Sequence, residues 1–129
     1  MKIVRYKECW GLRLARFGRN LIEIWFCPPR FEIEEHMHPQ ERIELFFLFG
    51  KKTFFSRRDI VTNKVDSAVV SFPRNIFKRF TIMPYHAHYF KVSSTWLVFL
   101  NWERWRKGCK PTSAAEDFKL TNYYAKKNN

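Results

Sequence analysis

The sequence lacks the features that mark membrane, secreted and disulfide-rich proteins. No apolar run approaches the ~18 residues that are needed to span a bilayer, and the N-terminus has no apolar segment typical of a secretory signal. Only three cysteines occur, Cys9, Cys27 and Cys109, an odd number with wide spacing. Such cysteines are typical of free thiols in a reducing compartment. We therefore expect a cytoplasmic protein with no membrane partner.

Blocks of like charge are also absent, although the chain is strongly basic. The 24 Lys and Arg outnumber the 12 Asp and Glu, so the formal net charge is +12 at pH 7. These basic residues are scattered, whereas nucleic-acid-binding arms carry runs of like charge. A positive net charge attracts anions at long range. It favours a small anionic ligand as the partner and leaves nucleic-acid binding through the basic surface as a weaker alternative.

Helical patterns are scarce before residue 105, and residues that suit strands are abundant. The 14 Phe, 5 Trp and 5 Tyr favour strands and large buried contacts. Apolar and polar residues alternate in several short segments, which are separated by turn signals. The segments that we expect to form strands are 2–6, 10–15, 21–27, 31–38, 43–49, 53–55, 68–72, 77–83, 88–92 and 96–102. The pattern predicts one all-β domain, a sandwich or a barrel.

The chain has only four histidines, and all of them fall in two His-x-His pairs, His36 with His38 and His86 with His88. On a strand, residues i and i+2 point to the same face, so each pair can direct two imidazoles at one point. Imidazole is the commonest protein ligand for Zn, Fe, Ni and Cu. In segment 31–38, the alternation places both histidines on one polar face, which we expect to line a cavity. The two pairs therefore predict a metal site.

Two motifs surround these histidines. The first is His36-x-His38, followed by a proline, an acidic residue, an apolar strand and a glycine, and the second is Pro84-x-x-x-His88. Together, in their order and spacing over residues 20–102, they resemble the two motifs of the cupin superfamily. The resemblance implies an all-β, cupin-like double-stranded β-helix (a jelly-roll barrel) whose cavity holds a divalent metal ion bound by three histidines and one glutamate. By resemblance, His36, His38 and His88 are metal ligands.

The glutamate of the first motif is displaced in this sequence. The family's position for it holds Arg42 or Ile43, while Glu41 comes one residue early and Glu44 one residue late. A β-bulge that shifts the register by one residue would bring either carboxylate inward. We favour Glu44 as the fourth ligand because it lies in a strand rather than in a turn. The alternatives are a site of three histidines and a pocket without metal.

Four further residues are candidates for substrate binding: His86, Arg42, Tyr85 and Tyr89. An imidazole-rich site with an open position can bind Fe(II) and activate O₂, or bind Zn or Mn and polarise a carbonyl. The resemblance therefore implies a metal-dependent dioxygenase or isomerase of a small anionic metabolite, with iron preferred over Mn, Zn or Ni. The alternative is a binding module that captures a small anionic ligand, such as a nucleotide or a sugar phosphate, without turnover.

The C-terminal part of the chain differs from the rest. We expect residues 1–105 to form the cupin-like barrel and residues 106–129 to form a tail with a short helix, which begins at a capping box from Ser113 to Glu116. The aromatic residues also exceed what one core of this size easily buries. We therefore expect a homodimer, which is a common assembly of small cupins.

Overall fold

All regular elements in the part of the chain that the structure describes are strands. The structure is a computed structural model, and it describes residues 1–37, 40–105 and 107–108. No helix occurs in these residues, so none of them belongs to a helix long and apolar enough to cross a membrane. The strands are β1 (Lys2–Tyr6), β2 (Cys9–Phe17), β3 (Asn20–Cys27), β4 (Glu32–His36), β5 (Gln40–Phe49), β6 (Thr53–Asp59), β7 (Val65–Val70), β8 (Arg79–Ile82), β9 (His86–Lys91) and β10 (Leu97–Trp105).

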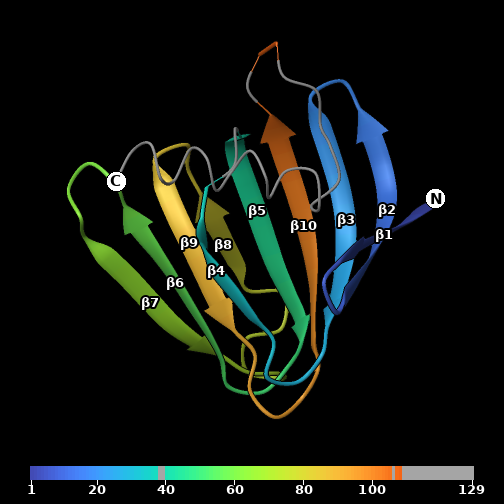
Figure 1. Cartoon of the computed structure of the whole chain (residues 1–129), viewed down its shortest axis with the longest axis vertical. Helices are drawn as coiled ribbons and strands as arrows, with labels where there is room; N and C mark the ends of the chain where they lie inside the picture. Colours follow the sequence, from blue (N-terminus) through green and yellow to red (C-terminus); the bar gives the residue numbers. More distant parts are fainter. Residues whose placement is uncertain (38–39, 106, 109–129) are drawn as a thin grey trace.

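The strands form two sheets that face each other (Figure 1). The six-stranded sheet has the order β1-β2-β3-β10-β5-β8, and the four-stranded sheet has the order β4-β9-β6-β7. All pairings within the sheets are antiparallel. The chain therefore crosses between the sheets several times, as in a jelly roll. The predicted all-β class and double-sheet architecture are confirmed.

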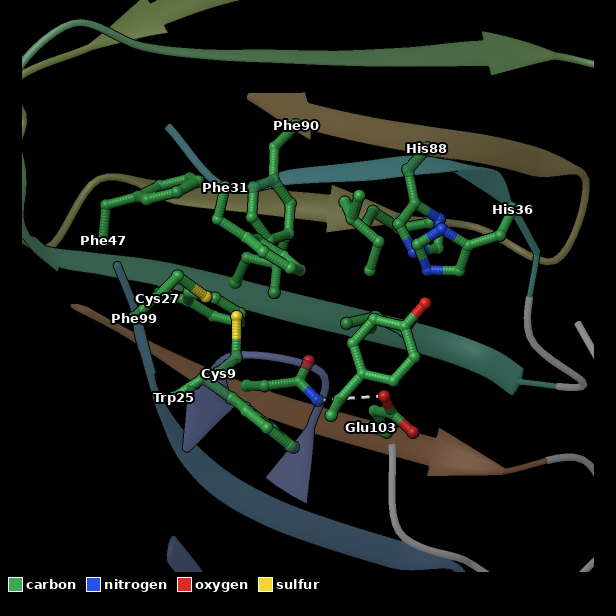
Figure 2. Close-up of a pocket in the computed structure, with 16 residues that line it drawn as sticks. Cys9, Trp25, Cys27, Phe31, His36, Phe47, His88, Phe90, Phe99 and Glu103 are labelled. Atoms are coloured by element: carbon green, nitrogen blue, oxygen red, sulfur yellow. Dashed lines mark hydrogen bonds between the residues drawn. The ribbon is translucent and has the colours of Figure 1, made fainter. Parts of the chain in front are cut away.

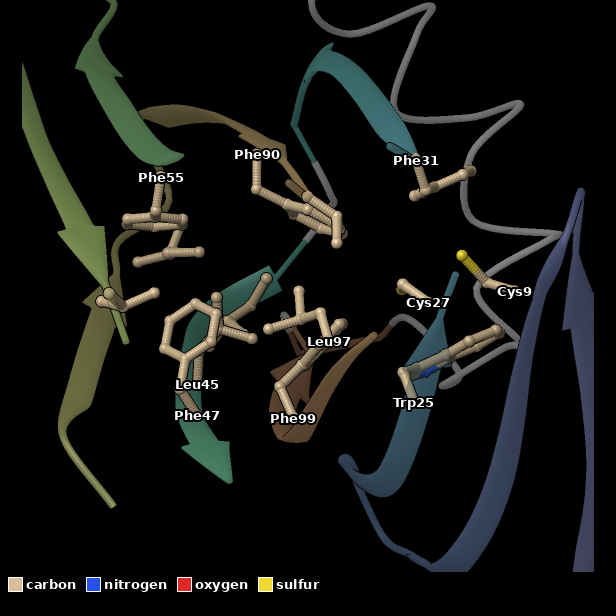
Figure 3. Close-up of a cluster of buried hydrophobic side chains, with 14 of the residues drawn as sticks. Cys9, Trp25, Cys27, Phe31, Leu45, Phe47, Phe55, Phe90, Leu97 and Phe99 are labelled. Carbon is tan, nitrogen blue, oxygen red and sulfur yellow. The ribbon is translucent and has the colours of Figure 1, made fainter. Parts of the chain in front are cut away.

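The core lies between the two sheets because alternate residues of each strand point inward. Along β3 and β10, every second residue is buried, and the residues between them are half-buried or exposed. Phe47 lies near the centre, and its ring packs on Phe55, Phe80 and Phe99 at centroid distances of 6.1, 5.3 and 6.2 Å. Burying one such side chain stabilises the fold by roughly 1.5–3 kcal/mol. Figure 3 shows the buried cluster, including Trp25, Phe31, Leu45, Phe47, Phe55, Phe90, Leu97 and Phe99.

The strand boundaries differ from the prediction mainly around β6 and β7. No strand was expected between segments 53–55 and 68–72, but β6 extends to Asp59 and β7 begins at Val65. The polar residues in these strands lie opposite one another, and the Arg57 side chain donates to the Asp66 carboxylate at 2.9 Å. Cross-strand pairs of opposite charge favour such pairing. The polar composition of these residues was therefore misleading, because they form paired strands and not a loop. The predicted C-terminal helix lies outside the described residues.

Candidate functional site

A small internal cavity of about 70 Å³ lies between the sheets. Its lining is mostly apolar, with aromatic side chains from both sheets. Figure 2 shows Phe47 and Phe99 at one end of the cavity and His36, His88 and Glu103 at the other. The polar residues among the lining are Tyr6, His36, His88, Asn101 and Glu103, beside the thiols of Cys9 and Cys27. The barrel therefore has one chemically distinct, polar end.

His36 and His88 form the centre of this polar end. They are register partners on β4 and β9, and their ring centroids lie 4.2 Å apart at an interplanar angle of 58°. Both side chains are buried, with 3% and 5% of their surface exposed. The Nδ1 of His36 lies 2.7 Å from the backbone carbonyl oxygen of Glu34, so Nδ1–H donates to that oxygen and Nε2 is the basic nitrogen. A hydrogen bond of this kind typically orients a metal-binding imidazole.

A β-bulge in β4 determines which way His36 points. Ile33 pairs with Phe90 and His36 pairs with His88, so the segment between the two pairs holds one more residue on β4 than on β9. The extra residue moves His36 to the inner face with Ile33, while Glu34 stays exposed. Regular alternation through segment 31–38 would have placed His36 on the same face as Glu32 and Glu34, and this prediction is therefore wrong. The histidine reaches the cavity because the strand does not alternate regularly.

The opposite wall of the cavity carries a buried carboxylate that the sequence analysis did not single out. Glu103 lies on β10, and its Oε1 accepts a hydrogen bond from Asn101 Nδ2 at 2.9 Å. Its Oε2 accepts a second from Trp105 Nε1 at 3.0 Å. Figure 2 shows Glu103 across the cavity from His36 and His88. The 97–105 segment carries apolar residues at both odd and even positions, so its alternation gave no signal for Glu103.

Two ionisable side chains near the polar end of the cavity, Tyr6 and Glu23, have raised pKa values. Tyr6 lies on β1 and lines the cavity, and burial, followed by the charge of Glu34, raises the pKa of its hydroxyl. Glu23 lies on β3 and is fully buried, and burial, followed by the charge of Glu103, raises its pKa to about 7. The phenol therefore stays protonated at neutral pH, and the charge of Glu103 disfavours ionisation of Glu23.

Glu44, the favoured carboxylate ligand in the sequence analysis, points away from the cavity. It lies on β5 between the inward-facing residues 43 and 45, and it does not line the cavity. Its Oε1 accepts from Arg42 Nε at 2.5 Å, and its Oε2 accepts from Thr81 Oγ1 at 2.8 Å. Arg79 Nε lies 3.6 Å from the same carboxylate. Arg42 and Glu44 thus belong to the outer face of the six-stranded sheet, and we leave both out of the proposed site.

The other three substrate-binding candidates also lie outside the cavity wall. His86 Nδ1 accepts a hydrogen bond from the backbone N–H of Met83 at 3.1 Å, and its ring packs on Tyr85 at 4.7 Å. Burial, followed by the charge of Arg57, lowers the pKa of His86. Tyr89 alternates with inward-facing neighbours on β9 and therefore points outward. The structure does not bring these residues together with His36 and His88.

The donor atoms partly fit the metal site that the fold implies. Two adjacent, buried imidazoles suit a divalent transition metal, and metal-binding histidines usually make a hydrogen bond like the one from His36 Nδ1 to the Glu34 carbonyl oxygen. In residues 1–37, 40–105 and 107–108, no group of three or more His, Cys, Asp or Glu is placed to hold a metal ion. His38, the third predicted histidine, lies outside these residues.

Comparison with known proteins gives matches in structure. No protein-family model matches the sequence, and no curated protein matches it. The capsular polysaccharide assembling protein CapF from Staphylococcus aureus superposes with a TM-score of 0.69 at 12% identity, over 91% of this chain and 32% of that chain. An oxalate oxidase gives a TM-score of 0.57 at 16% identity, over 67% and 42%. The 7S globulin of Momordica charantia gives 0.64 at 14% identity, over 80% and 31%.

The chain has a cupin-like jelly-roll fold. At these identities the likeness concerns the fold, and the chain spans less than half the length of each of the three proteins. The double-sheet cupin barrel predicted from the two sequence motifs is thereby confirmed as an architecture. Within this cupin barrel, His36 and His88 lie on the four-stranded sheet and Glu103 on the six-stranded sheet.

Proposed function

We propose that this cupin binds a divalent metal ion at the polar end of its cavity and acts there on a small anionic substrate. The observation that carries the proposal is the buried, side-by-side pairing of His36 and His88 on the cavity wall. His38 joins the proposed ligand set from the sequence motif alone. A bound ion would supply Lewis-acid chemistry or, for iron, redox chemistry. Iron is the first candidate, ahead of Mn, Zn and Ni, because the family resemblance favours a dioxygenase or an isomerase.

The size of the cavity limits the substrate. Small-molecule sites usually measure about 300–1,000 Å³, whereas this cavity measures about 70 Å³. A nucleotide or a sugar phosphate exceeds that volume, so we propose a substrate of a few non-hydrogen atoms. None of the described lining residues is Lys or Arg. The anionic group of the substrate would therefore lie toward the histidines, and the remainder would contact the aromatic walls.

Glu103 is the residue that we propose as the acid–base group. It is the only Asp or Glu among the described residues that line the cavity, and it lies opposite the histidines (Figure 2). Hydrogen bonds from Asn101 and Trp105 hold both of its oxygens. A carboxylate fixed in this way can take a proton from a substrate bound between the two walls, provided the substrate lies within hydrogen-bond reach.

A second function, ligand capture without turnover, has one observation in its favour. The described residues present two imidazoles to the cavity, and the carboxylate expected from the cupin motif, Glu44, faces outward. A site with too few ligands for a metal could still hold a small anion through protonated imidazoles. This alternative predicts that His36 and His88 matter for anion binding and that no metal is retained.

A cobalt titration tests the proposal and separates it from the alternative. Metal-free protein is titrated with Co(II), and the visible absorption of the cobalt–imidazole complex is followed. We expect saturation at one equivalent for the wild type and for His86→Ala, the matched control outside the cavity. His36→Ala and His88→Ala should lose this absorption. Equal spectra in all four proteins, or no absorption in the wild type, would overturn the metal site and favour ligand capture.

A further inference from the structure

Two of the three cysteines lie against each other in the cavity wall. Trp10 of β2 pairs with Phe26 of β3, so Cys9 and Cys27 are the next residues along this antiparallel ladder, and their side chains are hydrogen-bonded. Both side chains line the cavity and are buried, with 2% and 1% of their surface exposed. Figures 2 and 3 show the two cysteines on neighbouring strands of the same wall. The sequence spacing gave no indication of this pair.

The two thiols interact directly. A hydrogen bond with the Cys9 side chain, followed by burial, raises the pKa of the Cys27 thiol well above its usual range. This thiol is therefore protonated at neutral pH, and both cysteines are free of a disulfide in the structure. Trp25 and Phe31 line the same part of the cavity (Figure 3). The pair thus lies in apolar surroundings, which favour uncharged forms of sulfur over a charged thiolate.

The strand geometry suits a disulfide. Residues directly opposite each other on antiparallel strands have Cα atoms about 4.5–5.5 Å apart. A disulfide bridges Cα atoms that lie roughly 4.4–6.8 Å apart. A bond between Cys9 and Cys27 is therefore compatible with the ordinary spacing of neighbouring antiparallel strands. The product is uncharged, which is compatible with the apolar wall around it.

We propose that Cys9 and Cys27 are a redox-active pair, which a small hydroperoxide entering the cavity oxidises to a cross-strand disulfide. Because Cys27 keeps its proton, the Cys9 sulfur is the one that attacks: it gives up its proton and attacks a peroxide oxygen, the O–O bond breaks, the proton joins the leaving oxygen, and a Cys9 sulfenic acid and one water (or alcohol) form. The Cys27 sulfur then attacks the sulfenic sulfur, the S–S bond forms, and another water leaves. The two thiols lose two electrons, the peroxide gains them, and both thiol protons end in the released products.

The modification would act on the same cavity as the proposed metal site, but it does not depend on that site. A disulfide would join β2 to β3 covalently in the wall that Cys9 and Cys27 share with Trp25. The oxidised barrel should therefore resist denaturant better than the reduced barrel, because the cross-link restricts the unfolded chain. A reductant should reverse the change.

The test uses the full chain with Cys109→Ser, so that only the natural pair remains. The folded protein is treated with hydrogen peroxide, denatured, and alkylated with N-ethylmaleimide. We expect no maleimide addition. Apart from any oxygen added to methionine, the intact mass should be lower by two hydrogen atoms. Trypsin should release peptide 8–13 linked to peptide 20–30, and dithiothreitol should separate them.

Single substitutions provide the controls. Cys9→Ser and Cys27→Ser, each in the Cys109→Ser chain, should show no linked peptide, and Cys27→Ser should show a Cys9 sulfenic acid trapped by dimedone. Oxidation of the methionines shows that the peroxide treatment was effective. The inference is overturned if both natural thiols still react with maleimide after such a treatment. It is also overturned if oxidation reaches sulfinic acid on separate cysteines without any 8–13 to 20–30 link. Neither outcome bears on metal binding by His36 and His88.

Discussion

Glu23 and Glu103 are buried on neighbouring strands, and each accepts a hydrogen bond from the tryptophan two residues further along its own strand. Trp25 Nε1 lies 3.3 Å from Glu23 Oε1, and Trp105 Nε1 lies 3.0 Å from Glu103 Oε2. The two carboxyl groups share the inner face of the six-stranded sheet. Burial and the charge of Glu103 raise the pKa of Glu23 to about 7. The free energy of unfolding should therefore depend on pH through this pair.

Glu23→Gln should remove part of that pH dependence. The pKa of Glu23 rises from 4.5 to about 7 on folding, so the folded state keeps a proton that the unfolded state releases in this range. The associated stability is fully present below about pH 4.5 and is lost as the pH rises through about 7. The loss is on the order of 3 kcal/mol. Urea unfolding across this range should show the loss in the wild type and not in Glu23→Gln.

The exposed Glu34 provides the control for this prediction. Glu34→Gln should follow the wild-type curve of stability against pH. If Glu23→Gln and the wild type give parallel curves from about pH 5 to 8, Glu23 does not carry the shifted proton.

Phe47→Ala should destabilise the barrel strongly. The ring is buried and packs on Phe55, Phe80 and Phe99, so its removal leaves a cavity between the sheets. We expect a loss of roughly 3–5 kcal/mol in urea unfolding. Phe77, whose side chain is 67% exposed, is the matched control, and Phe77→Ala should change stability by less than about 0.5 kcal/mol. Similar losses for both variants would contradict the proposed core.

The predicted homodimer has a candidate surface on the outer face of the six-stranded sheet. Apolar side chains form rows across β2, β3, β10 and β5, and contiguous apolar patches of this kind mark protein–protein surfaces. In a symmetric dimer, the second copy would pack the same apolar rows of its own sheet against this face. The members of this surface are Trp10, Leu12, Ile22, Ile24, Phe26, Phe46, Val98, Leu100 and Trp102.

Charge substitutions on this face should separate the protomers. Trp10 and Trp102 are 45% and 43% exposed, so Trp10→Glu/Trp102→Glu should fold and sediment as a monomer at micromolar concentration. Val69, 50% exposed on the four-stranded sheet, is the control, and Val69→Glu should stay dimeric. Salt should strengthen the dimer, because it screens the repulsion between two strongly basic chains. A monomeric wild type would contradict the prediction.

Glu103→Gln should retain the metal that we propose at the histidines. Asn101 and Trp105 already donate to the two oxygens of this carboxylate, which suits an acid–base role rather than ligation. The amide N–H₂ of glutamine would face one of these donors, so we expect a stability loss of roughly 1–3 kcal/mol. Elemental analysis checks the first expectation and urea unfolding the second. Loss of metal in a folded Glu103→Gln protein would make Glu103 a ligand instead.

Alternation and turn residues are local signals, and they were sufficient to predict most of the strands and the all-β class. The jelly roll was predicted from the resemblance of two motifs to a known family. The β-rich run 21–27, for example, forms β3 over Asn20–Cys27. The sequence was insufficient for directions of individual side chains at the site. One extra residue before His36 turns this histidine inward, and the partners Arg42 and Thr81 hold Glu44 outward. Neither a bulge nor a cross-strand partner is visible in the spacing of one motif.

Local sequence patterns also could not predict which buried residues lie next to each other on neighbouring strands. Glu23 meets Glu103, and Cys9 meets Cys27, only because β3 lies between β2 and β10 in the sheet. Both strands carry apolar residues on both faces, so alternation did not mark Glu23 or Glu103 as buried. Their proximity depends on strand order, which a single sequence did not fix.

The metal content of the protein tests the central proposal most directly. The protein is purified without a metal-affinity tag and compared with the variant His36→Ala/His88→Ala by elemental analysis, with His86→Ala as the control for loss of a histidine. We predict about one equivalent of a divalent metal per chain, iron first, in the wild type and in His86→Ala. The double variant should be folded, by its circular dichroism, and free of metal. Wild-type protein without metal, or a folded double variant that keeps it, would contradict the proposed site.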